Sequence, residues 1–547
     1  MPRMTGGQAL VRALKAEGVE VVFGLPGVQI MHAYDAFFDN REVRLITCRH
    51  EQSTVFMADG YARSTGRIGA ALVVPGVGLY NAGAAMATAY AASSPVLLVC
   101  GQIDSSAIGK DMDALHEIRD QLDVMKPVVK WNDLVTRAEN IPEAIHEAMR
   151  QLKTGRPRPV EIDIPPDVLG TTVDIDIIEP ETYPRMEPGA ASVKAAVDLL
   201  AAAEHPLIWA GGGVNLADGS SELVELAELL GAPVLTTGEG KGAIPENHPL
   251  SMGSSAWGWG PGGDIVPQAD VILAAGTRLG NMGRGPNIDS TGTQKLINLN
   301  IDETEIGKTT PVTVGITADA KVGLKHLVAA LRDRPRRGKW DSADLAATKA
   351  NARELLKSEV PRQLAVAEGI QGAIPEDGFV VSGLTNVGYW SYLTYKTMRP
   401  RTYITSSYMG TLGFSYPMAL GVKVGNPDKA VVALCGDGGF MYAAAELATA
   451  VQYGINVVAV VFNNHHFGAS NRDQQTRFGG RVVGTELHNP DFVKLAESFG
   501  ARGIKAASLD EVPAAIEEAI AGDRPTIVEV ETPADLDPPF SLQPPQR

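Results

Sequence analysis

Short apolar runs alternate with helical patterns along the whole chain. They are VEVVFG (19–24), VRLIT (43–47), GAALVV (69–74), PVLLVCG (95–101), PLIWAGGG (206–213), APVLTT (232–237), DVILAAG (270–276), KLINLN (295–300), GFVVSG (378–383), AVVALCGDG (430–438), INVVAVVFNN (455–464) and PTIVEVE (525–531). Strands buried on both faces read as continuous apolar runs, and strands alternating with helices indicate parallel sheets. The pattern therefore predicts an α/β fold.

Two stretches interrupt the alternation and predict the domain organisation. Residues 171–192 carry prolines and acids without an apolar period, and residues 332–359 are heavily charged before passing into a polar helix. A chain of 547 residues is too long for one core. We therefore expect three doubly wound parallel-sheet domains at 1–170, 193–331 and 360–535, joined by these two linkers. The Pro-rich end, DLDPPFSLQPPQR, is expected to drape over a neighbour or to be disordered.

Composition restricts the partners and the compartment. A net charge of −16 argues against a nucleic-acid partner, because neutralising phosphates requires a basic face. No uninterrupted apolar stretch is long enough to predict a membrane span, and the amphipathic, helical start lacks the apolar core of a signal peptide. Three widely separated cysteines, Cys48, Cys100 and Cys435, are typical of reduced thiols in a cytoplasmic protein.

The segment from Gly436 to Asn464 has the pattern of a strand, a helix ended by Gly454, and a second strand that ends in two asparagines. In a βαβ unit both strand ends open on one edge of the sheet, so Asp437 and Asn464 are expected to face one crevice. A carboxylate, an amide oxygen and a nearby carbonyl suit Mg²⁺. Gly438 and Gly439 allow a diphosphate to approach the helix N-terminus. A plain turn with a capping Asp is the alternative, and the second asparagine-ended strand disfavours it.

This segment resembles the cofactor-binding motif of the thiamine-diphosphate (ThDP) enzymes, GDG followed about two dozen residues later by NN. The resemblance implies that Asp437 and Asn464 bind magnesium through their side chains and His466 through its main-chain oxygen. It also places Gly436, Phe467 and Gly468 at the cofactor. RHEQ (49–52) followed by MADGYAR (57–63) is similar to the segment with the cofactor-activating glutamate of acetolactate synthase and benzaldehyde lyase. Glu51 is thereby identified as the activating acid, although a glutamate in a first helical turn also suits the helix dipole.

Four further segments extend the resemblance. In SSYMGTLGFSYPMALG (406–421) it places Met409 and Gly410 at the pyrimidine ring and Leu412 as the apolar wedge under the cofactor. In SGLTNVGYW (382–390), Thr385 and Asn386 are the expected diphosphate donors. Pro26 and Gln29 fall at the mouth of the pyrimidine-binding domain, and His116 stands where acetolactate synthase has an active-site glutamine. Ordinary core, turn or structural roles remain the alternatives for Leu412, Thr385, Asn386 and His116.

The family has an N-terminal domain that holds the aminopyrimidine, a transhydrogenase-like middle domain, and a C-terminal domain that holds the diphosphate and metal. The resemblance to this family also implies a homodimer or a dimer of dimers with active sites between chains. In the middle domain, GKGAIPENHP matches the FAD-binding domain of acetolactate synthase, whereas AAGTRLGNMGRG (274–285) departs from it. FAD is therefore doubtful, and an empty middle domain is the expectation.

The leading hypothesis is a ThDP- and Mg²⁺-dependent lyase or transferase that decarboxylates a 2-oxo acid and adds the fragment to a carbonyl acceptor, as acetolactate synthase does. The alternative is an aldehyde-forming decarboxylase of the benzoylformate decarboxylase kind, or an acyloin (benzaldehyde) lyase. A sulfoacetaldehyde acetyltransferase-like enzyme and a nucleotide-binding oxidoreductase are further hypotheses, the last weakened because GGGVNLADG (211–219) lacks the G-x-G-x-x-G spacing. A ThDP-binding protein without activity would need a disabled Glu51.

Overall fold

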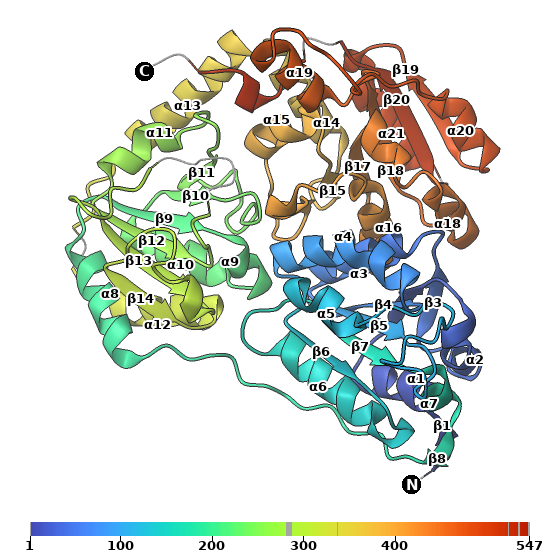
Figure 1. Ribbon diagram of the computed structural model, residues 1–547. Helices are drawn as coiled ribbons and strands as arrows, with labels where there is room; N and C mark the ends of the chain where they lie inside the picture. The colour runs from blue at the N-terminus through green and yellow to red at the C-terminus, as the bar shows by residue number, and fades with distance from the viewer. Residues whose placement is uncertain (1, 281–286, 336, 523, 534–535, 545–547) are drawn as a thin grey trace.

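The computed structural model describes residues 2–280, 287–335, 337–522, 524–533 and 536–544. These residues form three six-stranded sheets and one two-stranded pair. All paired strands within the three large sheets are parallel. Figure 1 shows each sheet with helices on both sides and the three units arranged around a common centre. The predicted fold class of three doubly wound parallel sheets is confirmed.

The N-terminal sheet has the order β3-β2-β4-β5-β7-β6. Its strands are β2 (Val21–Gly24), β3 (Arg44–Thr47), β4 (Gly69–Val73), β5 (Val96–Gly101), β6 (Trp131–Leu134) and β7 (Val160–Ile164). Its helices are α1 (Gly6–Ala16), α2 (Met31–Asp39), α3 (Glu51–Thr65), α4 (Val77–Ala92), α5 (Gln121–Met125), α6 (Ile141–Lys153) and α7 (Pro166–Gly170), with the short 3₁₀ turn η1 (Val28–Ile30). Helices α1, α2 and α6 pack in one core, and α3 and α4 pack in the other.

The middle sheet has the order β11-β10-β9-β12-β13-β14. Its strands are β9 (Pro206–Ala210), β10 (Val234–Thr236), β11 (Ser251–Ser254), β12 (Val271–Ala275), β13 (Lys295–Asn300) and β14 (Val314–Thr317). The helices are α8 (Ala190–Ala202), α9 (Gly212–Leu216), α10 (Ser220–Leu230), α11 (Gly262–Ile265) and α12 (Ala320–Leu331). Apolar side chains of α8, α10 and α12 fill one face, and a smaller cluster that includes Leu345 fills the other.

The C-terminal sheet has the order β16-β15-β17-β18-β20-β19. Its strands are β15 (Phe379–Ser382), β16 (Tyr403–Ile404), β17 (Val431–Gly436), β18 (Val458–Asn463), β19 (Arg502–Ala506) and β20 (Thr526–Glu531). The helices are α14 (Pro361–Ala373), α15 (Asn386–Thr394), α16 (Ser415–Gly425), α17 (Asp437–Met441), α18 (Glu446–Tyr453), α19 (Gly468–Arg477), α20 (Phe492–Ser498) and α21 (Val512–Ala521). The sequence predicts a single helix between Asp437 and Gly454, but the structure has two, α17 and α18, because residues 442–445 form turns between them. These turns place Glu446 against the N-terminal domain.

The N- and C-terminal domains share one continuous hydrophobic core. At its centre α3 crosses α16 with almost no space between the backbones, and Figure 1 shows the two helices facing each other between the sheets. A Cβ atom on Gly60 would lie 2.1 Å from the carbonyl oxygen of Met418, and one on Gly421 would lie 1.9 Å from that of Met57. Only glycine at both positions permits this approach.

The start of the chain, the two linkers and the C-terminal tail contain short strands, a helix and hydrogen bonds to the domains. The amphipathic helix predicted near the start of the chain is present as α1, which begins at Gly6. The short strand β1 (Arg3–Thr5) precedes it and pairs antiparallel with β8 (Thr172–Asp174) at the start of the first predicted linker. Residues 175–189 then run without helix or strand to the middle domain. In the second linker, α13 (Ser342–Glu359) is the expected polar helix. The described part of the tail lies on its own chain, where main-chain oxygens of Asp537 and Pro539 accept hydrogen bonds from Trp390 and Trp259.

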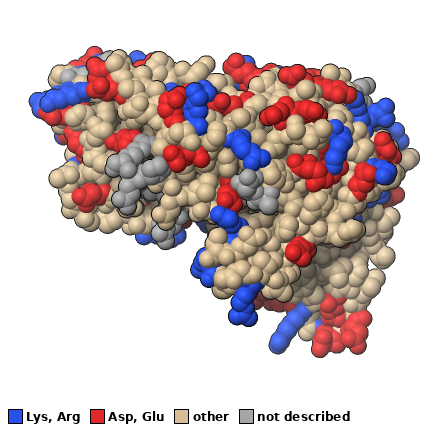
Figure 2. Space-filling model, turned by 90° about the horizontal axis from the view of Figure 1, so that it is seen from above, with Lys and Arg blue, Asp and Glu red and all other residues tan. Residues whose placement is uncertain are grey.

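The surface in Figure 2 carries acidic side chains interspersed with basic ones and with broad uncharged areas. Among the described residues, no helix combines the length and the apolar character that crossing a bilayer requires.

Candidate active site

Three neighbouring strands of the C-terminal sheet bring candidate cofactor residues to one edge. Strands β15, β17 and β18 are adjacent and parallel. Thr385 and Asn386 follow β15, Asp437 follows β17, and Asn464 follows β18. The sequence-based prediction that the two strand ends of the βαβ unit open on the same edge is therefore confirmed. Ligands of doubly wound sheets bind at this edge.

Asp437 is the first residue of α17, and its side chain is almost fully buried. One carboxylate oxygen, Oδ2, accepts a hydrogen bond of 2.7 Å from the side-chain amide of Asn489. Burial raises the pKa of Asp437, while the Asn489 amide and the backbone N–H groups of Gly438 and His465 act in the opposite direction. The carboxylate is thus held by donors on three sides.

The loop after β18 is folded back on itself. The side-chain oxygen of Asn464 accepts a hydrogen bond from the backbone N–H of His466, and the His466 ring contacts the Asn464 carbonyl oxygen at 2.6 Å. His465 has a positive φ of 57° and turns its ring toward Glu531, with 3.1 Å between Nε2 and Oε2. The described residues contain no cluster of three or more His, Cys, Asp or Glu side chains that could hold a metal. A metal at this edge therefore depends on amide and main-chain oxygens beside the Asp437 carboxylate.

The glycines around Asp437 leave room for a ligand. A Cβ atom on Gly436 or Gly439 would meet its first neighbour only at 3.7 Å and 4.0 Å, whereas one on Gly438 would lie 2.6 Å from the ring of Phe467. A Cβ on Gly468 would lie 2.9 Å from the side-chain nitrogen of Asn464. An all-oxygen donor set next to the open space at Gly436 and Gly439 fits Mg²⁺ and a diphosphate.

Thr385 and Asn386 lie at the start of α15. Thr385 is buried and caps the helix by accepting a hydrogen bond from the N–H of Val387, so its hydroxyl already has a structural role. Asn386 is half-buried, and its side-chain nitrogen is the next neighbour, at 3.8 Å, of a Cβ on Gly468. Asn386 thus faces the same space as the β18 loop.

The turn that carries Met409, Gly410 and Leu412 projects from the C-terminal domain onto α4. Met409 is exposed and Leu412 is half-buried. Gly410 has a φ of 63°, and a Cβ atom there would meet nothing within 4 Å. Thr411 lies between Gly410 and Leu412, and its hydroxyl forms a 2.8 Å hydrogen bond with the hydroxyl of Thr88 on α4. The turn therefore rests on the N-terminal domain of the same chain.

Glu51 begins α3 and is buried. Its Oε2 accepts a 3.0 Å hydrogen bond from the side-chain amide of Asn81, and a Cβ on Gly78 would lie 3.5 Å from its Cγ. Asn81 precedes Thr88 by seven residues on α4, a distance of about 10 Å along the axis. Glu51 and the Met409 turn of the same chain therefore lie at different parts of α4.

The other candidates of the N-terminal domain gather beside this acid. The Gln29 amide donates a 2.9 Å hydrogen bond to the carbonyl oxygen of Leu115, while its own oxygen is buried with no hydrogen-bond partner in the described structure. His116, which follows Leu115 in the chain, is half-buried and has a φ of 69°. Its Nδ1 is also buried without a hydrogen-bond partner among the described residues. A Cβ on Gly76 would lie 2.2 Å from the His116 oxygen, so the Glu51, Gln29 and His116 segments adjoin one turn. Pro26 is exposed at its rim.

Sequence reasoning does not find the amides that hold these acids. Asn81 holds Glu51, and Asn489 holds Asp437. Neither asparagine belongs to a motif identified in the sequence. Neither is close in sequence to its carboxylate, so no local spacing indicates the contact.

A cleft of about 1800 Å³ lies between the three domains. It is lined by loops after β9, β10, β12 and β13, together with Tyr389 and Tyr408 of the C-terminal domain. In the segment that argued against FAD (274–285), residues 281–285 lie outside the described residues.

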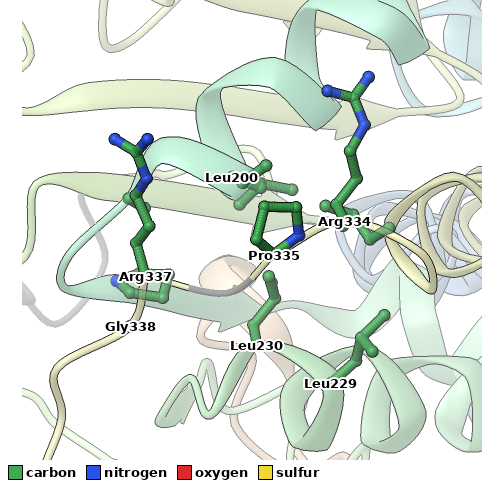
Figure 3. Close-up of a pocket in the computed structure, with 11 residues that line it drawn as sticks. Leu200, Leu229, Leu230, Arg334, Pro335, Arg337 and Gly338 are labelled. Atoms are coloured by element: carbon green, nitrogen blue, oxygen red, sulfur yellow. The ribbon is translucent and has the colours of Figure 1, made fainter.

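A second cavity, in the middle domain, is apolar and only about 10 Å³ in volume. Figure 3 shows Pro335 above Leu230, with the charged ends of Arg334 and Arg337 directed away. A space of this size holds one water at most, so it is a packing gap and not a binding site.

Three family models match the chain in the order of its sheets. The thiamine pyrophosphate enzyme N-terminal TPP binding domain matches residues 4–124, the central domain matches 193–327, and the C-terminal TPP binding domain matches 383–530.

Relatives match over nearly the whole chain. A probable acetolactate synthase large subunit of Methanococcus aeolicus is 35% identical over 96% of this chain and 92% of its own length. The acetolactate synthase large subunit of Haemophilus influenzae is 34% identical over 95% and 92%. A probable 2-ketoarginine decarboxylase of Pseudomonas aeruginosa is 35% identical over 93% and 90%. With all three domain models matched, and relatives of the acetolactate synthase type along its length, the chain belongs to the thiamine pyrophosphate enzyme family.

Proposed function

We propose that this chain is a ThDP- and Mg²⁺-dependent carboligase that removes CO₂ from a 2-oxo acid and joins the remaining fragment to a second carbonyl compound, as an acetolactate synthase does. The observation that carries the proposal is the placement of Asp437 and Asn464 at adjacent parallel strand ends, with Glu51 buried at a helix start in another domain. Two relatives named acetolactate synthase large subunit support it.

The metal and the diphosphate would be held at the edge of the C-terminal sheet. The side-chain oxygens of Asp437 and Asn464 and the main-chain oxygen of His466 would bind Mg²⁺. The further cofactor contacts that we propose are Pro26, Thr385, Asn386, Met409, Gly410, Leu412, Gly436, Gly438, Gly439, Phe467 and Gly468. We also retain the predicted domain bounds, 1–170, 193–331 and 360–535, as part of the proposal.

When bound, ThDP supplies a carbon nucleophile and an electron sink for the loss of CO₂. Glu51 would hold the proton at N1′ of the aminopyrimidine, and the Asn81 amide keeps this carboxylate in its orientation. Gln29 and His116, each with a buried polar atom that lacks a partner among the described residues, would position the substrate. The overall reaction is redox-neutral, so it needs no flavin, and we propose that the cleft between the three domains holds none.

The active sites are proposed to form between two chains, in a homodimer or a dimer of dimers. Beside the Glu51 turn, large apolar side chains stand exposed on three adjoining segments: Val28, Met31, Val77, Tyr80, Met112 and Leu115. An exposed apolar area of this kind is typical of an interaction site. A partner's diphosphate domain on this face would bring its cofactor to Glu51, which the same-chain Met409 turn does not approach.

The second candidate function is an aldehyde-forming decarboxylase, which releases the aldehyde after the loss of CO₂. The relative named 2-ketoarginine decarboxylase is as similar to this chain as the acetolactate synthases are. Acyloin cleavage and acyl transfer to phosphate are further alternatives that use the same proposed cofactor site.

The test incubates the purified chain, ThDP and Mg²⁺ with a panel of 2-oxo acids that includes pyruvate and 2-ketoarginine. The proposal expects CO₂ release from pyruvate with formation of acetolactate. Release of free aldehyde in place of acetolactate would favour the second candidate, and cleavage of benzoin would favour the lyase. No CO₂ from any 2-oxo acid, with ThDP demonstrably bound, would contradict the proposed function.

A further inference from the structure

One side-chain amide joins the two loops to which the proposed metal site belongs. The Nδ2 group of Asn489 donates a 2.7 Å hydrogen bond to Oδ2 of Asp437 and a 2.8 Å hydrogen bond to Oδ1 of Asn463. Asp437 follows β17, and Asn463 is the last residue of β18. Because an amide nitrogen carries two hydrogens, Asn489 satisfies both acceptors at once.

The segment that carries Asn489 is fastened to the β18 loop. The N–H of Leu487 donates to the carbonyl oxygen of His465 at 2.7 Å, and the N–H of Phe467 donates to the oxygen of Thr485 at 2.8 Å. The Leu487 side chain lies against α17, since a Cβ on Gly438 would be 3.0 Å from it. The position of Asn489 is therefore set by contacts that do not involve its own side chain.

Asn463, the second residue that accepts a hydrogen bond from Asn489, is itself held by a hydrogen bond to a neighbouring strand. Asn463 is almost fully buried, and its side-chain nitrogen donates a 3.1 Å hydrogen bond to Glu529 of β20. Glu529 in turn is 3.0 Å from Lys505 of β19. The Asn489 amide thus joins Asp437 to a chain of contacts that extends across three strands of the sheet.

We propose that Asn489 is a positioning residue for the metal: it holds the Asp437 carboxylate in the orientation that octahedral Mg²⁺ coordination requires. This inference rests on the proposed function. Mg²⁺ demands a nearly ideal octahedron, whereas Ca²⁺ accepts variable coordination. Groups that orient a metal ligand typically contribute 10- to 100-fold to metal affinity. Loss of the Asn489 amide should therefore weaken Mg²⁺ binding far more than Ca²⁺ binding.

The experiment measures metal binding directly, without turnover. Full-length wild type, Asn489→Ala and Asn489→Leu are stripped of metal, and MgCl₂ or CaCl₂ is titrated in the presence of ThDP by calorimetry. Leucine has the same number of side-chain heavy atoms and the same branching as asparagine but no donor, so it fills the site if alanine impairs folding. We expect the dissociation constant for Mg²⁺ to rise by about 10- to 100-fold in both variants, and that for Ca²⁺ to rise by less than about threefold.

The matched control is Asn471→Ala. The Asn471 amide is also buried and donates a 2.9 Å hydrogen bond to Thr485 of the same segment, without touching the Asp437 carboxylate. It should change neither constant. Equal losses for both metals, or wild-type Mg²⁺ affinity in Asn489→Leu, would overturn the inference while leaving the proposed function intact. A wild-type chain that binds no ThDP with either metal would overturn both.

Discussion

The backbone N–H of Arg49, in the N-terminal domain, donates one bifurcated hydrogen bond to the carboxylate of Glu446, in the C-terminal domain, with 3.0 Å to Oε1 and 3.2 Å to Oε2. Arg49 stands immediately before His50, which caps α3, and Glu51 is the first residue of that helix. Glu446 is fully buried and also accepts a 2.6 Å hydrogen bond from Thr449. One domain therefore holds the helix start on which the other domain presents its candidate catalytic acid.

We expect Glu446→Ala to lower the free energy of unfolding by about 2–3 kcal/mol, because it leaves the donors of a buried, charged hydrogen-bond acceptor without a partner. Urea denaturation, followed by circular dichroism, measures the change. Glu446→Gln retains one oxygen acceptor and should cost about half as much. Equal midpoints for wild type and the alanine variant would show that the contact contributes nothing to domain docking.

Glu51→Gln should reduce kcat by about 10²- to 10⁴-fold, the usual contribution of a positioned acid or base. Folding and ThDP binding should stay within about threefold of wild type, since glutamine preserves the shape and can still accept from Asn81. Steady-state kinetics with the preferred 2-oxo acid and calorimetry with ThDP measure the two effects. Glu20→Gln, an exposed residue paired with Arg67 in the same domain, is the control. Turnover near wild type in Glu51→Gln would rule out the assigned role.

Asp437→Ala should abolish Mg²⁺-dependent retention of ThDP, because it removes the one carboxylate of the proposed donor set. Retention is measured as cofactor that remains with the protein after gel filtration with and without Mg²⁺. The control is Asp473→Ala, which removes an acid that pairs with Arg477 on the surface of the neighbouring α19 and should retain the cofactor like wild type. Tight retention in Asp437→Ala would contradict the metal site.

The pH dependence of stability should contain a contribution from Asp59, a fully buried acid of α3. Burial raises the pKa of Asp59 from its ordinary value of 3.8 to about 6, against the attraction of Arg63. The folded chain therefore binds this proton more tightly than the unfolded chain does. The resulting stabilisation is complete below pH 3.8 and is lost as the pH rises through about 6.

Asp59→Asn, which does not titrate, should flatten the dependence of Tm on pH across this range. At neutral pH the variant should be more stable than wild type, by at most about 3 kcal/mol. Differential scanning calorimetry at several pH values between about 4 and about 7 makes the comparison. Parallel curves for the two proteins would show that Asp59 does not carry the proton.

Gly421→Ala should destabilise the contact between α3 and α16 by about 3 kcal/mol, because the new Cβ would collide with the carbonyl oxygen of Met57. Gly372→Ala is the matched control: it also lies in a helix, α14, but a Cβ there meets nothing within 4 Å. That variant should gain up to about 1 kcal/mol from the better helix propensity of alanine. Thermal denaturation of both variants tests whether Tm falls for Gly421→Ala and rises for Gly372→Ala. A Gly421→Ala protein as stable as wild type would contradict the close approach of α3 and α16.

The strands and the main motif are predictable because their signals are local. Every apolar run identified in the sequence lies on a strand of one of the three sheets, since interior strands of a parallel sheet are buried on both faces. The order of elements around Asp437 and Asn464 then places both at one edge, because the two strands of a βαβ unit are parallel and end on the same side.

Strand β7 is not among the predicted strands, although it lies inside its sheet and is fully buried. Its Glu161 and Asp163 interrupt the apolar run that marks a buried strand. Burial and their mutual proximity raise the pKa of Glu161, and burial raises that of Asp163, so protonation makes this placement tolerable. A linear pattern contains no information about such a shift in pKa.

The sequence by itself determined which loops carry the candidate cofactor chemistry, because the spacing of Gly436, Asp437 and Asn464 within one βαβ unit admits only one arrangement of strand ends. Only the tertiary structure decided what holds those groups: Asn489 on Asp437, Asn81 on Glu51, and Glu446 on the start of α3. These partners are 30 to 397 residues apart in the chain. Their contacts result from how whole domains pack, and packing of distant segments leaves no periodic trace in either of them.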